Sequence, residues 1–291
     1  MRLITYKIDE KIQIGALKND KIIPFLQDSK IPLDMLSFLE DIDYSIDRAK
    51  KLYKSSKIFI DLKKVKILKP IIRPPKIIAI GLNYADHLDE IRVSGRKIET
   101  PSVPMIFNKQ SLSANGPFDD IIKPVVSDKV DYEGELTIVI GKKCRHVNKD
   151  NAKDVIAGYT IGNDVSVRDW QMRAPTFTIG KSFDTHCPFG PSIVTKDEIT
   201  DPHNLDLVTE VNGKIRQSSN TKNLIFDCYD IIEHLSTAFT LEPGDLILTG
   251  TPGGVGVVDN LFLKHGDIVK VSISEIGLSL IHISEPTRLL R

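Results

Sequence analysis

Short runs of aliphatic, often β-branched residues follow one another from residue 76 to residue 273, separated by turns rich in Gly and Pro. Runs of this length and composition are typical of β-strands. We expect strands at Ile77–Ile80, Met105–Phe107, Leu136–Ile140, Ala157–Gly162, Leu205–Val211, Asp245–Thr249 and Asp267–Ile273. Only two helices are expected among them, one from near Asn83 past Glu90 and one over Tyr229–Thr240. Many strands with few helices argue against a doubly wound sheet, so we expect an α+β, β-rich domain.

The first 68 residues have a different pattern, which predicts a small α+β unit. Leu3–Ile8 and Lys11–Leu17 alternate in polarity, and a polar turn over residues 18–21 precedes Ile22–Phe25. Residues 33–54 have apolar side chains at helical spacing and end in lysines, which suit a helix C-terminus. Prolines at 70, 74 and 75 then interrupt the chain. We therefore expect a small N-terminal domain over residues 1–68 and a second domain over residues 69–277.

The composition argues against several classes of protein. Lys+Arg and Asp+Glu both total 39 of 291 residues, so the balanced charge gives no sign of nucleic-acid or membrane-surface binding. No apolar run approaches the roughly 20 residues that span a bilayer. The first residues carry charges too early for a secretory signal. Cys144, Cys187 and Cys228 are widely spaced, which indicates reduced thiols and predicts a cytoplasmic protein.

Residues 278–291 look foreign to the rest of the chain. They resemble the in-frame translation of a sequencing-library adapter, and they do not continue the strand pattern that ends at residue 274. We expect a non-native tail, with a genuine short tail as the alternative. His282 is therefore left out of the site predictions.

Three carboxylates provide the first sign of chemistry. Glu133 and Glu135 are two residues apart at the start of an expected strand, so both side chains should lie on the same face. Asp164 follows another expected strand. Like charges held this close repel unless a proton or a cation lies between them. An oxygen-only set suits Mg²⁺ or Mn²⁺, although solvated charges at a strand edge remain the alternative.

A second group lies on the helix expected near residue 83. His87 and Glu90 are three residues apart and so share a helix face. A carboxylate beside an imidazole orients it and raises its basicity, which makes His87 a candidate general base for a water molecule. A surface histidine in a helical ion pair is the alternative. No His-Glu-x-x-His motif is present, so a zinc protease is excluded.

Two loops could complete a site. Lys181 is the only cation in the loop over residues 179–191 and could stabilise a developing oxyanion. The Gly-rich loop over residues 249–256 lacks the patterns of a P-loop and of a dinucleotide site. It could present backbone N–H groups and the Thr251 hydroxyl to a carboxylate, or it could be a purely structural turn.

These segments, in this order, resemble the fumarylacetoacetate hydrolase family over about residues 70–277, in its branch of domain-containing-protein-2-like and 2-hydroxyhepta-2,4-diene-1,7-dioate isomerase-like members. The strings that carry the resemblance are Gly81–His87, Tyr132–Leu136, Gly162–Gln171, Gly180–Asp184, Asp201–His203, Val211–Gly213 and Thr249–Gly256. Each string alone is modest, but their ordered combination is specific.

The resemblance implies a mixed β-roll catalytic domain behind a small N-terminal domain, and a homodimer. It implies Mg²⁺ (with Mn²⁺ or Ca²⁺ as alternatives) bound by Glu133, Glu135 and Asp164. His87 and Glu90 would activate water, and Lys181 would lie beside the oxygens of a small 2-oxo acid substrate. Arg168, Gln171 and Thr251 are the implied substrate contacts.

Two kinds of reaction fit these parts. The leading hypothesis is hydrolysis of the C–C bond of a 2,4-dioxo acid through a pyruvate enolate, with His87 activating the water. The alternative is that the same enolate is reprotonated, which gives keto–enol tautomerisation or isomerisation of oxaloacetate or hydroxymuconate-type acids. The enolate could also form by decarboxylation of an acid such as oxaloacetate. A non-catalytic binding protein is the third and weakest hypothesis.

Overall fold

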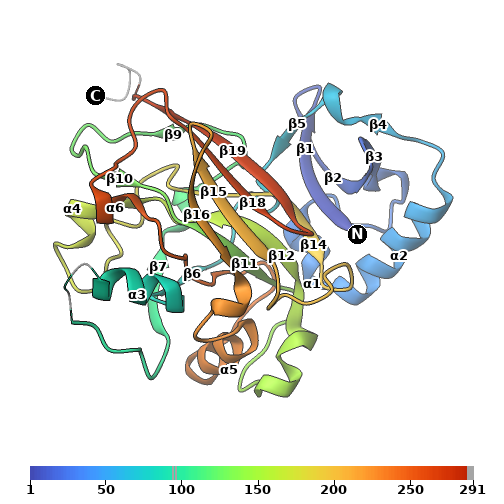
Figure 1. Ribbon diagram of the computed structural model, residues 1–291. Helices are drawn as coiled ribbons and strands as arrows, with labels where there is room; N and C mark the ends of the chain where they lie inside the picture. Colours follow the sequence, from blue (N-terminus) through green and yellow to red (C-terminus); the bar gives the residue numbers. More distant parts are fainter. Residues whose placement is uncertain (94, 96, 287–291) are drawn as a thin grey trace.

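Two β-sheets, packed face to face, form the body of the molecule. The computed structural model describes residues 1–93, 95 and 97–286, and Figure 1 shows its elements. The larger sheet runs β4-β3-β2-β1-β14-β12-β11-β17-β6-β7, with β5 paired to β1 and β8 to β14. Its strands are β1 (Arg2–Ile8), β2 (Lys11–Lys18), β3 (Lys21–Pro24), β4 (Ile60–Asp61), β5 (Lys66–Leu68), β6 (Ile77–Gly81), β7 (Met105–Lys109), β8 (Ala114–Asn115), β11 (Gly134–Ile140), β12 (Ile156–Asn163), β14 (Cys187–Thr195) and β17 (Leu246–Leu248).

The second sheet runs β16-β15-β18-β19-β9 and covers one face of the first. It consists of β9 (Ile121–Ile122), β15 (Asp206–Val211), β16 (Lys214–Asn220), β18 (Ile268–Ile273) and β19 (Gly277–Ser284), while β10 (Val130–Asp131) and β13 (Ser166–Val167) form a separate short pair. The largest apolar core lies between the two sheets, with Ile138, Ile161, Leu207 and Val271 among its buried members. The expected β-rich α+β fold with mixed sheets is confirmed.

The helices lie around the sheets. They are α1 (Met35–Glu40), α2 (Ile42–Ser55), α3 (Ala85–Val93), α4 (Arg168–Gln171), α5 (Cys228–Ala238) and α6 (Gly256–Asp259). The two helices expected after residue 76 correspond to α3 and α5. In α5, a capping box formed by Asp227 and Asp230 satisfies amides of the first turn. Among the described helices, none has the length and apolar character needed to cross a membrane.

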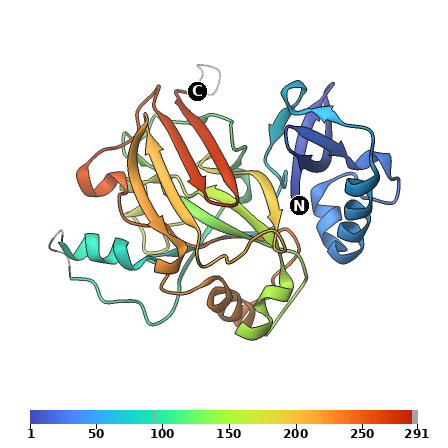
Figure 2. The same ribbon diagram turned by 45° about the vertical axis from the view of Figure 1, so that its right-hand side comes forward.

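The N-terminal unit stands to one side of the rest of the molecule (Figure 2), and its strands β1–β5 belong to the larger sheet. Strand β1 pairs with β14 through Arg2 and Leu3, so one sheet runs through both units. The expected helix over residues 33–54 is two helices, because Asp41 adopts a non-helical conformation between them. The division into domains at residue 68 stays a prediction.

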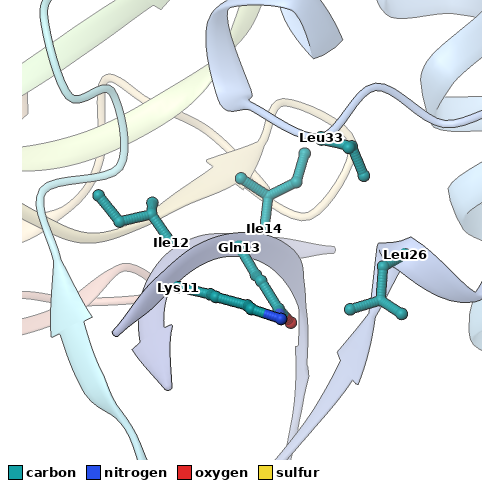
Figure 3. A pocket seen from close by; sticks show the side chains of 6 residues that line it. All are labelled: Lys11, Ile12, Gln13, Ile14, Leu26 and Leu33. Atoms are coloured by element: carbon teal, nitrogen blue, oxygen red, sulfur yellow. The ribbon is translucent and has the colours of Figure 1, made fainter. Parts of the chain in front are cut away.

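A shallow apolar pocket of about 380 Å³ lies on this N-terminal unit (Figure 3). Its lining residues are Lys11, Ile12, Gln13, Ile14, Leu26 and Leu33. No carboxylate or histidine is among them, so the pocket offers no chemistry of the kind predicted from the sequence.

Two segments differ from the sequence predictions. The region over residues 187–191, expected to be part of a loop, begins β14, and its prolines are tolerated although the strand is internal to the sheet. Residues 278–284 were also expected not to continue the strand pattern, but they form most of β19 (Gly277–Ser284), while the non-native origin of residues 278–291 stays a prediction. Strand β19 pairs with β18 from Ile273↔Gly277 to Ile268↔His282, and buries Ile281 and Ile283 in the core. Residues 287–291 of the expected tail lie outside the described residues.

Candidate active site

The three predicted carboxylates meet where two antiparallel strands end. Gly134 of β11 pairs with Asn163 of β12, so Glu133 and Asp164 lie at neighbouring strand ends. Glu133, Glu135 and Asp164 each offer a carboxylate oxygen within 4.8 Å of the others, and all three residues are buried. The alternative of solvated charges at a strand edge is therefore wrong.

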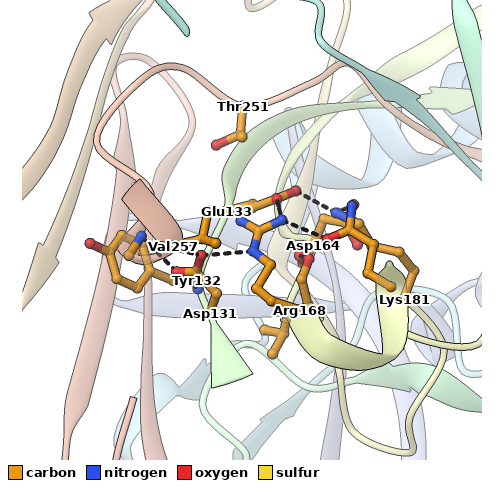
Figure 4. A network of polar contacts seen from close by, with 12 residues as sticks. Asp131, Tyr132, Glu133, Asp164, Arg168, Lys181, Thr251 and Val257 are labelled. Carbon is orange, nitrogen blue, oxygen red and sulfur yellow. Dashed lines mark hydrogen bonds and ion pairs between the residues drawn. The ribbon is translucent and has the colours of Figure 1, made fainter. Parts of the chain in front are cut away.

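Buried cations neutralise two of these acids (Figure 4). The ammonium of Lys181 lies 2.7 Å from Glu133 Oε2 and 2.8 Å from Asp164 Oδ2. Lys109, at the end of β7, lies 2.6 Å from Asp164 Oδ1. Burial lowers the pKa of Lys181, but the charges of Asp164 and Glu133 outweigh burial and raise that pKa above its usual value.

Arg168, the first residue of α4, joins Glu133 to a fourth acid. Its Nε donates to Asp131 Oδ2 at 2.8 Å, and its Nη1 lies 2.6 Å from Glu133 Oε1. Burial raises the pKa of Glu133, yet the charges of Lys181 and Arg168 outweigh burial and lower that pKa to about 2. Glu133 is therefore a firmly ionised carboxylate.

Glu135 has a different environment. Its Oε2 accepts a hydrogen bond from Gly250 N at 2.6 Å, and no cationic partner for it is recorded among the described residues. Burial, followed by the negative charges of Asp164 and Glu133, raises the pKa of Glu135 well above its usual value. A buried carboxylate of this kind needs a proton or a cation beside it. The oxygen-only donor set fits a divalent metal ion held by Glu133, Glu135 and Asp164.

The Gly-rich loop over residues 249–256 binds carboxylates of the protein itself. Gly250 N donates to Glu135, Gly254 N donates to Glu90 Oε1 at 2.9 Å, and Gly256 N donates to Asp131 Oδ1 at 2.8 Å. Gly250 has a φ of +104°, and a Cβ there would lie 2.8 Å from Asn83 Cβ. The sequence suggested that these loop amides bind a carboxylate, and they do so with acidic side chains of the protein.

The predicted His87–Glu90 pair is present on α3. His87 Nδ1 lies 3.1 Å from Glu90 Oε2, and the other oxygen of Glu90 accepts the Gly254 amide. An ionised Glu90 therefore favours a proton on Nδ1 and leaves Nε2 as the basic nitrogen. Asp86, on the same helix, accepts hydrogen bonds from Gly253 N and Ser219 Oγ. Asn83, which precedes this helix, donates from its side chain to Thr249 O and Phe226 O.

The three predicted substrate contacts are already bonded within the protein. Gln171 Oε1 accepts from Arg168 Nη1 at 3.0 Å, while Arg168 Nη2 is buried without a partner. The Thr251 hydroxyl donates to Gly134 O at 3.0 Å and accepts from Gln217 Nε2 at 2.8 Å. Their role in binding substrate stays a prediction.

Sequence reasoning missed Lys109, Asp131 and Gln217. Asp131 directly precedes the Tyr132–Leu136 string, and Gln217 lies just beyond the Val211–Gly213 string. Closeness to these strings was the sequence signal that could have identified both residues. Lys109 had no signal, because nothing in a lysine-rich sequence marks a buried lysine.

The family model described as fumarylacetoacetate (FAA) hydrolase C-terminal matches residues 76–281, which is more than half of the chain. The chain belongs to the fumarylacetoacetate hydrolase family. The match begins just before β6 and ends within β19, so it contains every residue of the acid cluster and of the His87–Glu90 pair.

Relatives in this family are enzymes, and so is this chain. The rat protein named oxaloacetate tautomerase Fahd2a, mitochondrial, is 44% identical over 254 residues, covering 86% of this chain and 80% of its own length. The crystal structure of a maleylpyruvate hydrolase from Sphingobium sp. SYK-6, in complex with manganese (II) ion and pyruvate, is 30% identical. It has a TM-score of 0.82 and covers 99% of this chain and 100% of its own.

A third similar protein is an isomerase. The structure of 5-carboxymethyl-2-hydroxymuconate delta-isomerase from Mycobacterium smegmatis is 33% identical, with a TM-score of 0.79, and covers 98% of this chain and 100% of its own. The buried acid triad of this fumarylacetoacetate hydrolase family member and the manganese complex of the hydrolase both support divalent-metal binding, while the individual metal ligands stay a prediction.

The comparisons correct one prediction. The rat relative, like its human and bovine counterparts, is named a mitochondrial protein, so the cytoplasmic location expected from the cysteines is contradicted. Reduced thiols report a reducing compartment, and the cytoplasm is only one of several. The homodimer implied by the family resemblance stays a prediction.

Proposed function

We propose that this chain is a divalent-metal-dependent tautomerase of a small 2-oxo dicarboxylic acid such as oxaloacetate. The observation that carries the proposal is a buried acid triad and a histidine–carboxylate pair that are both hydrogen-bonded to the same Gly-rich loop, in a chain 44% identical over 254 residues to an oxaloacetate tautomerase. Mg²⁺ and Mn²⁺ are both suitable ions for the site, and such an ion supplies positive charge that favours negative charge on the 2-oxo oxygen of the substrate.

The protein's own residues would divide the remaining work. His87, oriented by Glu90, takes a proton from C3 of the keto acid at Nε2. The electrons of the broken C3–H bond form the C2–C3 double bond, and the proton now held on His87 is returned, through solvent, to the 2-oxo oxygen to give the enol. The reverse steps return the keto form, so no water is consumed.

Lys181 contributes charge at the reacting oxygens. An ammonium has three N–H donors, and two of those of Lys181 point to Glu133 and Asp164. Among the described residues no third hydrogen-bond acceptor is recorded for this ammonium, which also lies 4.9 Å from the centroid of the Phe107 ring, so the third N–H could bind an oxygen of the substrate. Because the cluster is buried, an anionic oxygen there is stabilised more strongly than in water.

Hydrolysis of the C–C bond of a 2,4-dioxo acid is the second candidate. It is favoured by the same His87–Glu90 pair, which can equally activate water, and by the likeness to a maleylpyruvate hydrolase at 30% identity. Hydrolysis was the leading hypothesis from the sequence. The relatives favour proton transfer over it, because the more similar rat protein is a tautomerase.

One assay separates the two candidates and the decarboxylase alternative. Oxaloacetate and a panel of 2,4-dioxo acids are incubated with the protein and Mg²⁺ or Mn²⁺ while enol absorbance, pyruvate and CO₂ are followed. Tautomerisation gives loss of enol without pyruvate. Pyruvate with a carboxylic acid would instead identify a hydrolase, and pyruvate with CO₂ a decarboxylase.

A further inference from the structure

The backbone between the two metal-binding glutamates is held by side chains. Strand β17 pairs with β11 only over Thr137–Val139, so Gly134 has no strand partner on that side. Gly134 N instead donates to Gln217 Oε1 at 3.0 Å, and Gly134 O accepts from the Thr251 hydroxyl at 3.0 Å. The two side chains take the place of a neighbouring strand at this point.

Gln217 uses its whole amide in this arrangement. It lies on β16 and is 1% exposed. Its Nε2 donates to Thr251 Oγ1 at 2.8 Å and to Pro252 O at 2.9 Å, while its oxygen accepts the Gly134 amide. Reversing the amide would set its NH₂ group against the Gly134 N–H, so its orientation is fixed. A closed ring of hydrogen bonds therefore joins Gln217, Thr251 and Gly134.

The second sheet also limits Gly134 by contact. A Cβ at residue 134 would lie 2.4 Å from Thr209 Oγ1, on the neighbouring strand β15. Glycine is therefore required between the two glutamates, since a side chain there would collide with the side chain of Thr209. Both the contact and the hydrogen bond come from the same sheet, in which β15 and β16 pair from Asp206↔Asn220 to Val211↔Lys214.

We propose that Gln217 is a positioning residue that sets the spacing of Glu133 and Glu135 for the metal ion by holding Gly134 against the Thr251–Pro252 segment. This inference rests on the metal site of the proposed function. Residues behind metal ligands typically change metal affinity or activity 10–100-fold when removed, and a ligand displaced by about 1 Å has effects of this order.

The test measures Mn²⁺ binding to metal-stripped protein by electron paramagnetic resonance, with the urea unfolding midpoint as a separate readout. Gln217→Met keeps the length of the side chain and removes its three hydrogen bonds. Ser218→Ala, at the exposed neighbour on the same strand, is the matched control. We expect Gln217→Met to bind Mn²⁺ about 10–100-fold more weakly, and Ser218→Ala to bind it as the wild type does.

A second pair of variants changes Thr251, the other side chain in the hydrogen-bonded ring. These variants test the inference even if Gln217→Met does not fold. Thr251→Val removes the hydroxyl, and Thr251→Ser keeps it. Thr251→Val should weaken Mn²⁺ binding while Thr251→Ser restores it, and the Gln217→Met/Thr251→Val double variant should lose little more than either single variant.

The outcomes separate this inference from the proposed function. Wild-type protein that binds no Mn²⁺ would contradict the metal site itself. Wild-type binding with Gln217→Met and Thr251→Val both within twofold of it would overturn the role of Gln217 and leave the proposed function standing.

Discussion

The acid cluster and helix α3 are the two halves of the candidate site, and they are built in opposite ways. The acids of the cluster are buried, and their partners come from β7, α4, the loop that carries Lys181 and the Gly-rich loop. On α3, the side chains of His87 and Glu90 are 13% and 24% exposed, and the helix meets the Gly-rich loop through Asp86 and Glu90. A metal site needs ligands held rigidly, whereas a proton-transfer group must reach a substrate that enters and leaves.

The largest effect is expected in the rigid half. Glu135→Gln removes the one carboxylate of the triad for which no cationic partner is recorded among the described residues. Metal-dependent turnover should fall by about 10³-fold or more, because charge stabilisation at the reacting oxygen is lost. Enol loss and Mn²⁺ binding are measured together. Activity at the wild-type rate would contradict the assignment of the metal site.

The second-largest effect, on kcat, distinguishes the role of helix α3 from that of the acid cluster. His87→Asn should lower kcat by about 10²–10⁴-fold, because the general base is lost. Mn²⁺ binding should stay within a factor of about two, since His87 is not one of the three candidate metal ligands. Weakened Mn²⁺ binding in this variant would show that α3 belongs to the rigid half after all.

A pH prediction comes from a second histidine, His186, whose Nε2 lies 3.1 Å from Ile122 O. Burial lowers the pKa of His186 to about 3. In the unfolded chain His186 gains a proton as the pH falls below about 6.5, whereas in the folded chain it stays neutral. The free energy of unfolding therefore reaches its full value, as far as this residue is concerned, above about pH 6.5. It falls by about 1.4 kcal/mol for each pH unit from 6.5 toward 3.

Urea unfolding between pH 7.5 and 4.5 measures this slope. His186→Gln keeps a donor for Ile122 O and removes the titrating group, so it should flatten the pH dependence in that range. An equally steep slope in the variant would place the titration at another residue.

The smallest effect is expected at the surface of α3. Arg92 Nη1 lies 2.8 Å from Asp89 Oδ1, and both side chains are exposed. Asp89→Asn should change the free energy of unfolding by about 0.5 kcal/mol or less, because exposed ion pairs are screened by solvent. Thermal unfolding with and without 0.5 M NaCl measures it, and a loss above about 2 kcal/mol would mean that this pair is structurally important.

The parts of the site that sequence could predict are those with a local period. Glu133 and Glu135 alternate along a strand, and His87 and Glu90 repeat along a helix turn, so spacing alone placed each pair. Asp164 and Lys181 belong to other segments. The position of Asp164 after a strand suggested that it joins the two glutamates, and the family resemblance added Lys181. Several of the longer strands were found from their apolar runs, whereas β14 was hidden by its glycine and prolines.

What sequence could not predict are partners that depend on tertiary contacts. The Gly-rich loop was expected to present amides to a carboxylate, but the sequence did not show that the carboxylates would be those of Glu90, Asp131 and Glu135. Strand β19 was missed because its sequence looked foreign, although Ile281 and Ile283 alternate correctly for a half-buried strand. The pairing of a segment depends on its alternation, whatever its origin.

The most direct measurement follows enol-oxaloacetate and pyruvate in one cuvette, with protein stripped of metal by a chelator and then supplied with Mg²⁺ or Mn²⁺. We predict that stripped protein leaves the enol at its spontaneous rate, and that added metal speeds the loss of enol without forming pyruvate. Enol loss at the same rate without metal, or pyruvate formed in step with enol loss, would contradict a metal-dependent tautomerase.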